Sequence, residues 1–158
     1  MHPNEKLIET FYTAFQKRDA QAMRDCYDAA AEFSDPVFQN LKGPQVPAMW
    51  RMLCERGKDL TIEFSAIQAD DLTGKAHWEA MYTFSATGRK VHNRIDASFE
   101  FKNGKIVRHT DVFDLWRWTR MALGFKGILL GWTPFVQNAV RKQALRSLSK
   151  FMENENIS

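Results

Sequence analysis

Three side chains in this sequence have types and positions suited to acid–base chemistry. Asp35 lies in the run Ser34-Asp35-Pro36-Val37, and His109 and Asp111 lie two residues apart in a segment that alternates like a β-strand. A His and an Asp on one strand face could orient a water molecule or share a proton. A carboxylate that faces an apolar cavity has a raised pKa, because its charged form is poorly solvated, and this suits proton abstraction.

Each of these residues also has a structural interpretation. Asp35 precedes a proline and could start a turn or cap a neighbouring amide. Asp111 could form an ion pair with Arg108 or Arg120 that anchors its strand. Asp114 is placed to cap the helix that follows. The residue types alone leave both interpretations open.

Motifs for cofactors and metals are absent. The sequence has no Gly-rich phosphate loop, nucleotide fingerprint or Ser/His/Asp order, and no metal-ligand spacing links His77, His92 and His109. We therefore expect no cofactor and no metal site. Cys26 and Cys54 occupy apolar positions of helical patterns without a CxxC spacing, which predicts buried free thiols.

Composition and charge limit the class of protein. The 158 residues fit one domain, and 44% hydrophobic with 26% charged residues exclude a disordered chain or a membrane bundle. Twelve Phe, five Trp and three Tyr predict a large core or an aromatic-lined cavity. A net charge of +3 is too small to indicate a nucleic-acid partner. The N-terminus does not resemble a signal peptide, and no apolar run reaches the ~18–20 residues of a spanning helix, so we expect a cytoplasmic protein.

Hydrophobic periodicity divides the chain into elements. Helical spacing predicts a first helix over residues 7–15 behind an Asn4 cap, a short second helix over 22–27 capped by Asp19, and a third between Pro44 and Gly57. From residue 60 the pattern alternates and predicts four strands joined by tight turns, hence an antiparallel meander. Residues 115–152 return to helical character.

This order predicts an α+β domain in which three N-terminal helices pack on one face of a curved antiparallel sheet and form a cone with an internal pocket. Residues 1–158 form one domain, with 115–152 as a C-terminal helical extension. On the inner face we expect the pocket to be lined by Trp50, Trp78, Tyr82, Asn93, Phe113 and Phe11, although aromatic residues in such positions are more often plain core.

The helices, the Ser34-Asp35-Pro36-Val37 segment, the Trp-rich meander and the run Asn103-Gly104-Lys105-Ile106 followed by His109–Asp114 resemble the SnoaL-like branch of the nuclear-transport-factor-two-like superfamily. That superfamily includes ketosteroid isomerase, polyketide cyclases and limonene epoxide hydrolase. The resemblance implies a cavity between the helices and the concave sheet face, and dimerisation through the other sheet face.

By the same resemblance, Asp35 matches the general base of ketosteroid isomerase-like proteins, and Asp111 an acid of limonene epoxide hydrolase. Both catalytic sets are incomplete. The oxyanion-hole tyrosine falls on Phe11, with Tyr12 expected on a different face. The Arg-x-Asp pair falls near Trp78 and Ala80 and is absent.

Which acid faces the cavity depends on the last hairpin. A two-residue turn at Asn103-Gly104 sets Asp96 opposite Asp111, whereas a three-residue turn with a glycine bulge sets Ile95 opposite Asp111. The second register turns His109 and Asp111 inward and leaves Asp96 outside. The resemblance favours it.

The outer sheet face and the tail suggest contacts. His77 and His92 lie on the outer face among charges of both signs, as in a dimer interface or a solvated surface. The apolar, Gly-punctuated stretch over residues 116–132 could close the open end of the cone or join the dimer contact. It could also form a mobile lid, or touch a membrane while basic residues of the last helix meet anionic headgroups.

Together these features predict a cytosolic homodimer that binds a small apolar molecule. Asp35 and Asp111, with His109, could catalyse cofactor-independent isomerisation, hydration or cyclisation. The alternatives are a non-catalytic ligand carrier and a protein-interaction or dimerisation module. The sequence does not decide whether the protein is an enzyme.

Overall fold

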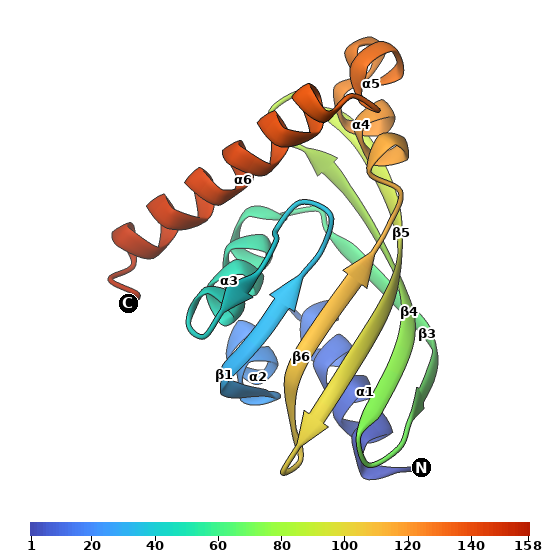
Figure 1. Cartoon of the computed structure of the whole chain (residues 1–158), viewed down its shortest axis with the longest axis vertical. Helices are drawn as coiled ribbons and strands as arrows, with labels where there is room; N and C mark the ends of the chain where they lie inside the picture. Colours follow the sequence, from blue (N-terminus) through green and yellow to red (C-terminus); the bar gives the residue numbers. More distant parts are fainter.

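The computed structural model describes all 158 residues as six helices and six strands (Figure 1). The helices are α1 (Pro3–Gln16), α2 (Ala20–Asp25), α3 (Gln45–Arg56), α4 (Leu115–Leu123), α5 (Phe125–Leu130) and α6 (Pro134–Asn154). The strands are β1 (Tyr27–Ser34), β2 (Leu41–Lys42), β3 (Thr61–Ala69), β4 (Thr73–Phe84), β5 (Arg89–Lys102) and β6 (Lys105–Val112).

The strands form one sheet in the order β2-β1-β6-β5-β4-β3. Strands β3 to β6 are successive antiparallel neighbours, which confirms the predicted meander. The sheet is nevertheless mixed, because β1 runs parallel to β6 with Phe33 opposite His109. Periodicity within one segment cannot reveal such a pairing between distant segments.

The N-terminal helices lie against one face of the curved sheet, and the core fills the space between them (Figure 1). This confirms the α+β prediction. Burial along β5 alternates strictly, as the period of a strand with one covered face requires. The buried residues of β5 are Val91, Asn93, Ile95, Ala97, Phe99 and Phe101.

Two predicted helix caps are present. The amide of Ala22 donates to Asp19 Oδ1 over 3.0 Å at the start of α2, and the amide of Arg117 donates to Asp114 Oδ1 over 3.0 Å at the start of α4. The predicted bounds of α3, between Pro44 and Gly57, also hold.

Two predictions for the N-terminal part of the chain are wrong. His2, not Asn4, caps α1: its Nδ1 accepts from the Asn4 amide over 3.0 Å, and its own amide donates to Glu5. Asn4 instead donates to the carbonyl of Asp70. Tyr27 begins β1 rather than ending α2, because its backbone pairs with β6; its apolar spacing from the helix suited either element.

The last hairpin has the two-residue turn of the first predicted register, but beyond Ile106 its pairing follows neither prediction. Asn103 and Gly104 form a two-residue turn with φ of 52° and 72°, and Lys102 pairs with Lys105. The register then shifts in mid-strand, where Val107 is the extra residue of a β-bulge.

Beyond the bulge, Ala97 lies opposite Asp111 and Phe99 opposite His109. His109 and Asp111 therefore point inward, as the favoured register required, but for a different reason. Asp96 lies on the outer face, as predicted, and bonds there to His77.

Residues 115–154 continue the chain as three helices. The C-terminal half of α6 packs on α3, and Leu148 and Phe151 join the main core. Arg141 Nε donates to the carbonyl of Pro36 over 2.9 Å, so α6 is tied to the loop that carries Asp35. None of the helices has the length and hydropathy that crossing a bilayer would need.

Glycines bring α5 close to α4. A Cβ at Gly127 would overlap the carbonyl oxygen of Thr119, and a Cβ at Gly131 would overlap the Thr119 hydroxyl. These two glycines permit tight packing of the helices, which accounts for them without the hinge motion expected of a lid.

Candidate functional site

A chain of hydrogen bonds crosses the core and ends at Asp111. The indole Nε1 of Trp50 donates to the Tyr27 hydroxyl over 2.9 Å, and that hydroxyl lies 2.7 Å from His109 Nδ1. His109 Nε2 lies 2.8 Å from Asp111 Oδ1, which also accepts from Trp78 Nε1 over 3.4 Å. Four elements, α3, β1, β6 and β4, thus hold one carboxylate.

The hydrogen-bond donors in this series determine which ring nitrogen of His109 carries the proton. Tyr27 accepts from Trp50, so its own proton needs an acceptor, and His109 Nδ1 is the one within reach. Leaving a buried hydroxyl proton unpaired would cost about 1–3 kcal/mol. The ring proton of His109 therefore sits on Nε2 and is donated to Asp111.

Aromatic rings enclose His109, and its side chain is 0% exposed. The ring of Trp50 stacks on it at 5.8 Å between centroids, Phe99 lies at 4.3 Å, and Phe33 meets it edge-on at 5.0 Å. With both nitrogens bonded and both faces covered, His109 can orient Asp111 but has no free atom for a ligand.

Asp35 lies in the loop after β1, and its carboxylate accepts two backbone bonds. Oδ1 receives the amides of Val37 (2.7 Å) and Phe38 (2.6 Å). The pKa of Asp35 is raised to about 7, mainly by burial and in part by the charge of Asp111, although the two amide bonds lower it. The capping interpretation is thus present, together with the raised pKa expected of an acid–base group.

Several polar atoms on the inner face remain unpaired. Asp35 and Asp111 each use only Oδ1 in hydrogen bonds, and the amide of the buried Asn93 makes none. The buried side-chain atoms that are both unpaired and sealed from solvent are Tyr12 Oη and Arg120 Nε. The free atoms of Asp35, Asp111 and Asn93 do not belong to this sealed set, although Asp111 and Asn93 are only 3% and 7% exposed.

Tyr82 adds a donor on the same face. Its hydroxyl accepts from Trp118 Nε1 over 2.7 Å, so its own proton is free to donate. Burial raises the pKa of Tyr82, and the charge of Asp35 contributes to the rise. Asp35 thus interacts electrostatically with Tyr82 as well as with Asp111, and these three groups share one region of the interior.

Tyr12 is a residue that the sequence interpretation missed. We expected it on a different face from Phe11, but both are 0% exposed and their rings meet edge-on at 5.1 Å. The covered face of α1 is wide enough to include adjacent residues. Burial raises the pKa of Tyr12 well above its usual value, and the charge of Asp111 contributes. Its hydroxyl is thus a neutral, unpaired donor in the interior.

The expected lining residues fall into two groups. Phe11 and Trp50 are sealed in the core and pack against each other at 5.4 Å, so they support the site without bordering open space. Tyr82 and Phe113 are partly exposed, and Asn93 has a free amide. Trp78 bridges the two groups through its bond to Asp111.

The outer sheet face carries charges of both signs, as expected. His77 bonds to Asp96 (2.9 Å) and Glu79 (3.3 Å), and His92 bonds to Glu79 (2.6 Å). Bonding to Asp96 raises the pKa of His77. No group of three or more His, Cys, Asp or Glu has an arrangement that could hold a metal ion.

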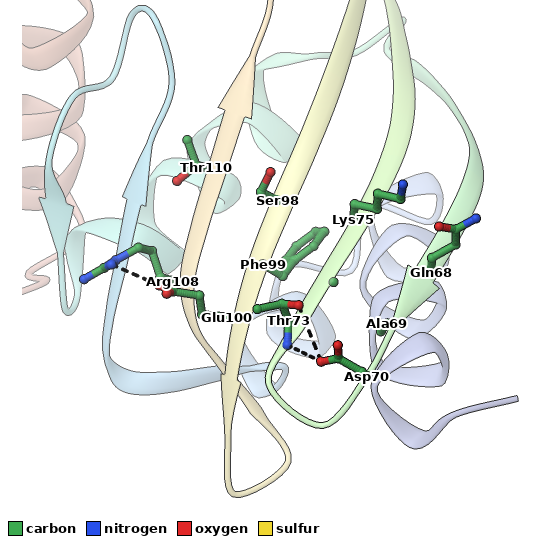
Figure 2. Close-up of a pocket in the computed structure, with 11 residues that line it drawn as sticks. Gln68, Ala69, Asp70, Thr73, Lys75, Ser98, Phe99, Glu100, Arg108 and Thr110 are labelled. Carbon is green, nitrogen blue, oxygen red and sulfur yellow. Dashed lines mark hydrogen bonds and ion pairs between the residues drawn. The ribbon is translucent and has the colours of Figure 1, made fainter.

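A polar groove of about 710 Å³ lies on this same outer face (Figure 2). Lys75, Ser98 and Thr110 line it from three adjacent strands, together with the ion pair of Arg108 with Glu100 (3.0 Å). The groove is open and charged, and it is separated by the sheet from Asp35 and Asp111.

The two cysteines are free and buried, as predicted. Burial raises the pKa of the Cys26 thiol to about 11 and that of the Cys54 thiol to about 11. Both thiols stay protonated at neutral pH and are unsuited to act as nucleophiles.

Comparison with known proteins places this geometry in context. A sequence profile of the SnoaL-like domain matches residues 8–109. No significant match is found among curated proteins.

Solved structures of similar fold are distant in sequence. An NTF2-like protein of unknown function from Burkholderia pseudomallei is 18% identical with a TM-score of 0.68, covering 77% of this chain and 98% of its own. A putative polyketide cyclase from Pseudomonas putida is 19% identical with a TM-score of 0.64 and the same two coverages, 77% and 98%. An LEH-like epoxide hydrolase from M. tuberculosis is 19% identical with a TM-score of 0.60, covering 82% and 91%. These likenesses concern the fold alone.

The unpaired hydroxyl of Tyr12 leads to a prediction about stability. We expect Tyr12→Phe to leave the free energy of unfolding unchanged or to raise it by up to about 1 kcal/mol, because it removes a buried group without a partner. Tyr27→Phe is the matched control and should lower the free energy of unfolding by about 1–3 kcal/mol, because Trp50 and His109 lose their partner. Urea denaturation measures both, and a larger loss for Tyr12→Phe would contradict the assignment.

The raised pKa of Asp35 predicts how stability depends on pH. The folded chain holds this proton more tightly than the unfolded chain between the ordinary value of 3.8 and about 7. Stability is therefore greatest below pH 4 with respect to this group and falls as pH rises through that window, by at most about 1.4 kcal/mol per pH unit.

Asp35→Asn keeps an acceptor oxygen for the two amides but cannot ionise. We expect it to be more stable than the wild type by about 1–3 kcal/mol at pH 8, and by much less at pH 5. Asp28→Asn is the control, because Asp28 also accepts a backbone amide, that of Ala30, but is exposed. Equal effects of the two substitutions at both pH values would show that Asp35 is not destabilised by its surroundings.

Proposed function

The chain belongs to the SnoaL-like domain family, and we propose that it binds a small, largely apolar molecule on the inner face of its sheet and transfers a proton to or from it without a cofactor. Reactions of this kind are isomerisation, hydration, ring opening and cyclisation. One observation carries the proposal: Asp35 and Asp111 each leave one carboxylate oxygen without a hydrogen-bond partner, and they lie near enough for the charge of Asp111 to raise the pKa of Asp35.

Asp35 is the proposed general acid–base residue. A pKa of about 7 means that both protonation states are populated near neutral pH, so one carboxylate can accept a proton and later return it. The two amides on Oδ1 hold the group in place and leave Oδ2 to face the ligand.

Asp111 is the proposed second acid. Its Oδ1 is held by His109 and Trp78, so Oδ2 can accept a hydrogen bond from a ligand hydroxyl or orient a water molecule. His109 is a positioning residue, since it acts only through Asp111. The Asn93 amide and the Tyr82 hydroxyl are donors for oxygen on which negative charge develops.

The known relatives support this class of reaction without specifying it. Structures of similar fold include one named an epoxide hydrolase and one named a putative polyketide cyclase. The Arg-x-Asp pair and the oxyanion-hole tyrosine are both missing here, so a reaction of either standard type is not proposed.

A non-catalytic ligand carrier is the second candidate. The absence of the oxyanion-hole tyrosine and of the Arg-x-Asp pair favours it, because binding a ligand requires neither. A carrier would yield its ligand chemically unchanged, and native mass spectrometry of the purified protein would detect it.

The proposed activity predicts a pH profile and two sensitive carboxylates. In a screen of small cyclic enones and terpenoid epoxides, kcat/KM should rise through about pH 7 when Asp35 acts as a base, because the base must be ionised. Asp35→Asn and Asp111→Asn should each lower kcat at least about 100-fold, and the control Asp28→Asn should not. Turnover that survives both substitutions would exclude this mechanism.

We also propose that the outer sheet face forms a homodimer contact. The helices leave it uncovered, and the apolar Val112 is 60% exposed among its charges. Sedimentation velocity should show a dimer that Val112→Glu dissociates. Leu72→Glu is the control, because this exposed leucine lies outside the sheet face. A monomeric wild type would refute the contact.

A further inference from the structure

Large apolar side chains project into solvent around α5. Phe125 is 74% exposed, Trp132 61% and Phe135 84%. The apolar apex, as we name this surface, consists of Phe125, Ile128, Leu129, Leu130, Trp132 and Phe135, all exposed. Six large exposed apolar side chains within residues 125–135 are a concentration rather than scattered single residues, and such a concentration marks a contact site.

The packing of α5 is the reverse of an ordinary surface helix. The side that meets α4 carries Gly127 and Gly131, which press on Thr119, while the large residues face outward. Burial of apolar surface within this domain would place the large residues inward. The helix is therefore held in position with its apolar side available to a partner.

The surrounding charge is of one sign. Residues 115–152 carry seven of the 22 Lys and Arg and none of the 19 Asp and Glu. The rest of the molecule consequently has a net negative charge. Arg117 and Arg141 are committed to backbone carbonyls, whereas Lys126, Lys142 and Arg146 are exposed without a partner.

The position of α5 suits contact with a flat surface. It lies at the upper end of the molecule in Figure 1, beyond the ends of β4 and β5 and away from the hairpins at the opposite end. Nothing in the domain projects past it there, so a planar partner can reach the apex.

We propose that the apolar apex docks this protein on an anionic membrane surface, with its aromatic and aliphatic side chains in the headgroup region and the lysines and arginines of α5 and α6 against the lipid phosphates. The N–H of Trp132 already donates to the Leu129 carbonyl over 3.0 Å, so its ring can enter the headgroup region without leaving a donor unpaired. Attachment would be peripheral, since no helix here could span a bilayer.

The charge favours a membrane over a second copy of the chain. A two-fold contact sets a patch against itself, so two apices would bring basic segments without any acidic residue into proximity. Anionic lipids supply the missing counter-charge.

Vesicle flotation with the full chain tests the proposal. The protein should float with vesicles of phosphatidylcholine and phosphatidylglycerol, far less with phosphatidylcholine alone, and less again at high salt. The emission of its exposed tryptophans should shift to the blue on binding. Absence of flotation, or equal flotation with both lipids, would overturn the proposal.

Substitutions locate the contact. Phe125→Ser combined with Phe135→Ser should weaken partitioning at least about tenfold, because two exposed rings no longer insert. The control is Leu72→Ser, an exposed leucine in the hairpin at the other end of the molecule. Lys126→Glu should weaken partitioning about fivefold or more, whereas Lys102→Glu should not.

Two further outcomes would refute the proposal. If the Phe double variant dissociates a dimer and the wild type does not bind vesicles, the apex is a contact between copies. If the double and control variants partition equally, binding occurs elsewhere. Neither result depends on the proposed activity, which is measured separately.

Discussion

Asp111 keeps its carboxylate inside an aromatic core only because His109 and Trp78 donate to it. An ionised carboxylate without partners would be expelled from such a core, at a cost of several kcal/mol. The hydrogen-bonded chain supplies those partners, and it needs β1 parallel to β6, the indole of α3 above Tyr27 and the bulge at Val107. Most of the topology therefore bears on the placement of one side chain.

The interior has two regions that differ in packing: one is filled with aromatic rings, and the other contains polar atoms without partners. Around His109 the rings are sealed, and they form a rigid support with no room for a ligand. Around Asp35, Asn93 and Tyr82 the polar atoms are left unpaired, which costs stability and leaves groups ready to bind. Folding has already removed these polar groups from water, so the free-energy cost of their desolvation is met before a ligand binds.

Two surfaces outside the core follow opposite rules. The outer sheet face balances its charges through His77, Glu79 and Asp96. Residues 115–152 of the C-terminal helices combine exposed apolar residues with charge of one sign, and glycines hold α5 close to α4. The same small domain thus carries unpaired polar groups in its interior, balanced charges on its outer sheet face and exposed apolar residues at its apex.

Local sequence determined the elements that depend on local physics: the helical and alternating periods, the caps Asp19 and Asp114, the turns, the inner and outer faces of β5, and the candidates Asp35 and Asp111. Contacts between distant segments lay beyond it. Tyr27 and Tyr12 became inner-face residues through pairing and packing with strands far along the chain, and spacing alone assigned Tyr27 to a helix. The bulge at Val107 turns the side chains of His109 and Asp111 inward. Their orientation was predicted correctly, but the strand register that produces it was not. The state of Asp35 was decided by tertiary structure, because burial and the charge of Asp111 act through space, whereas its two amide bonds are local.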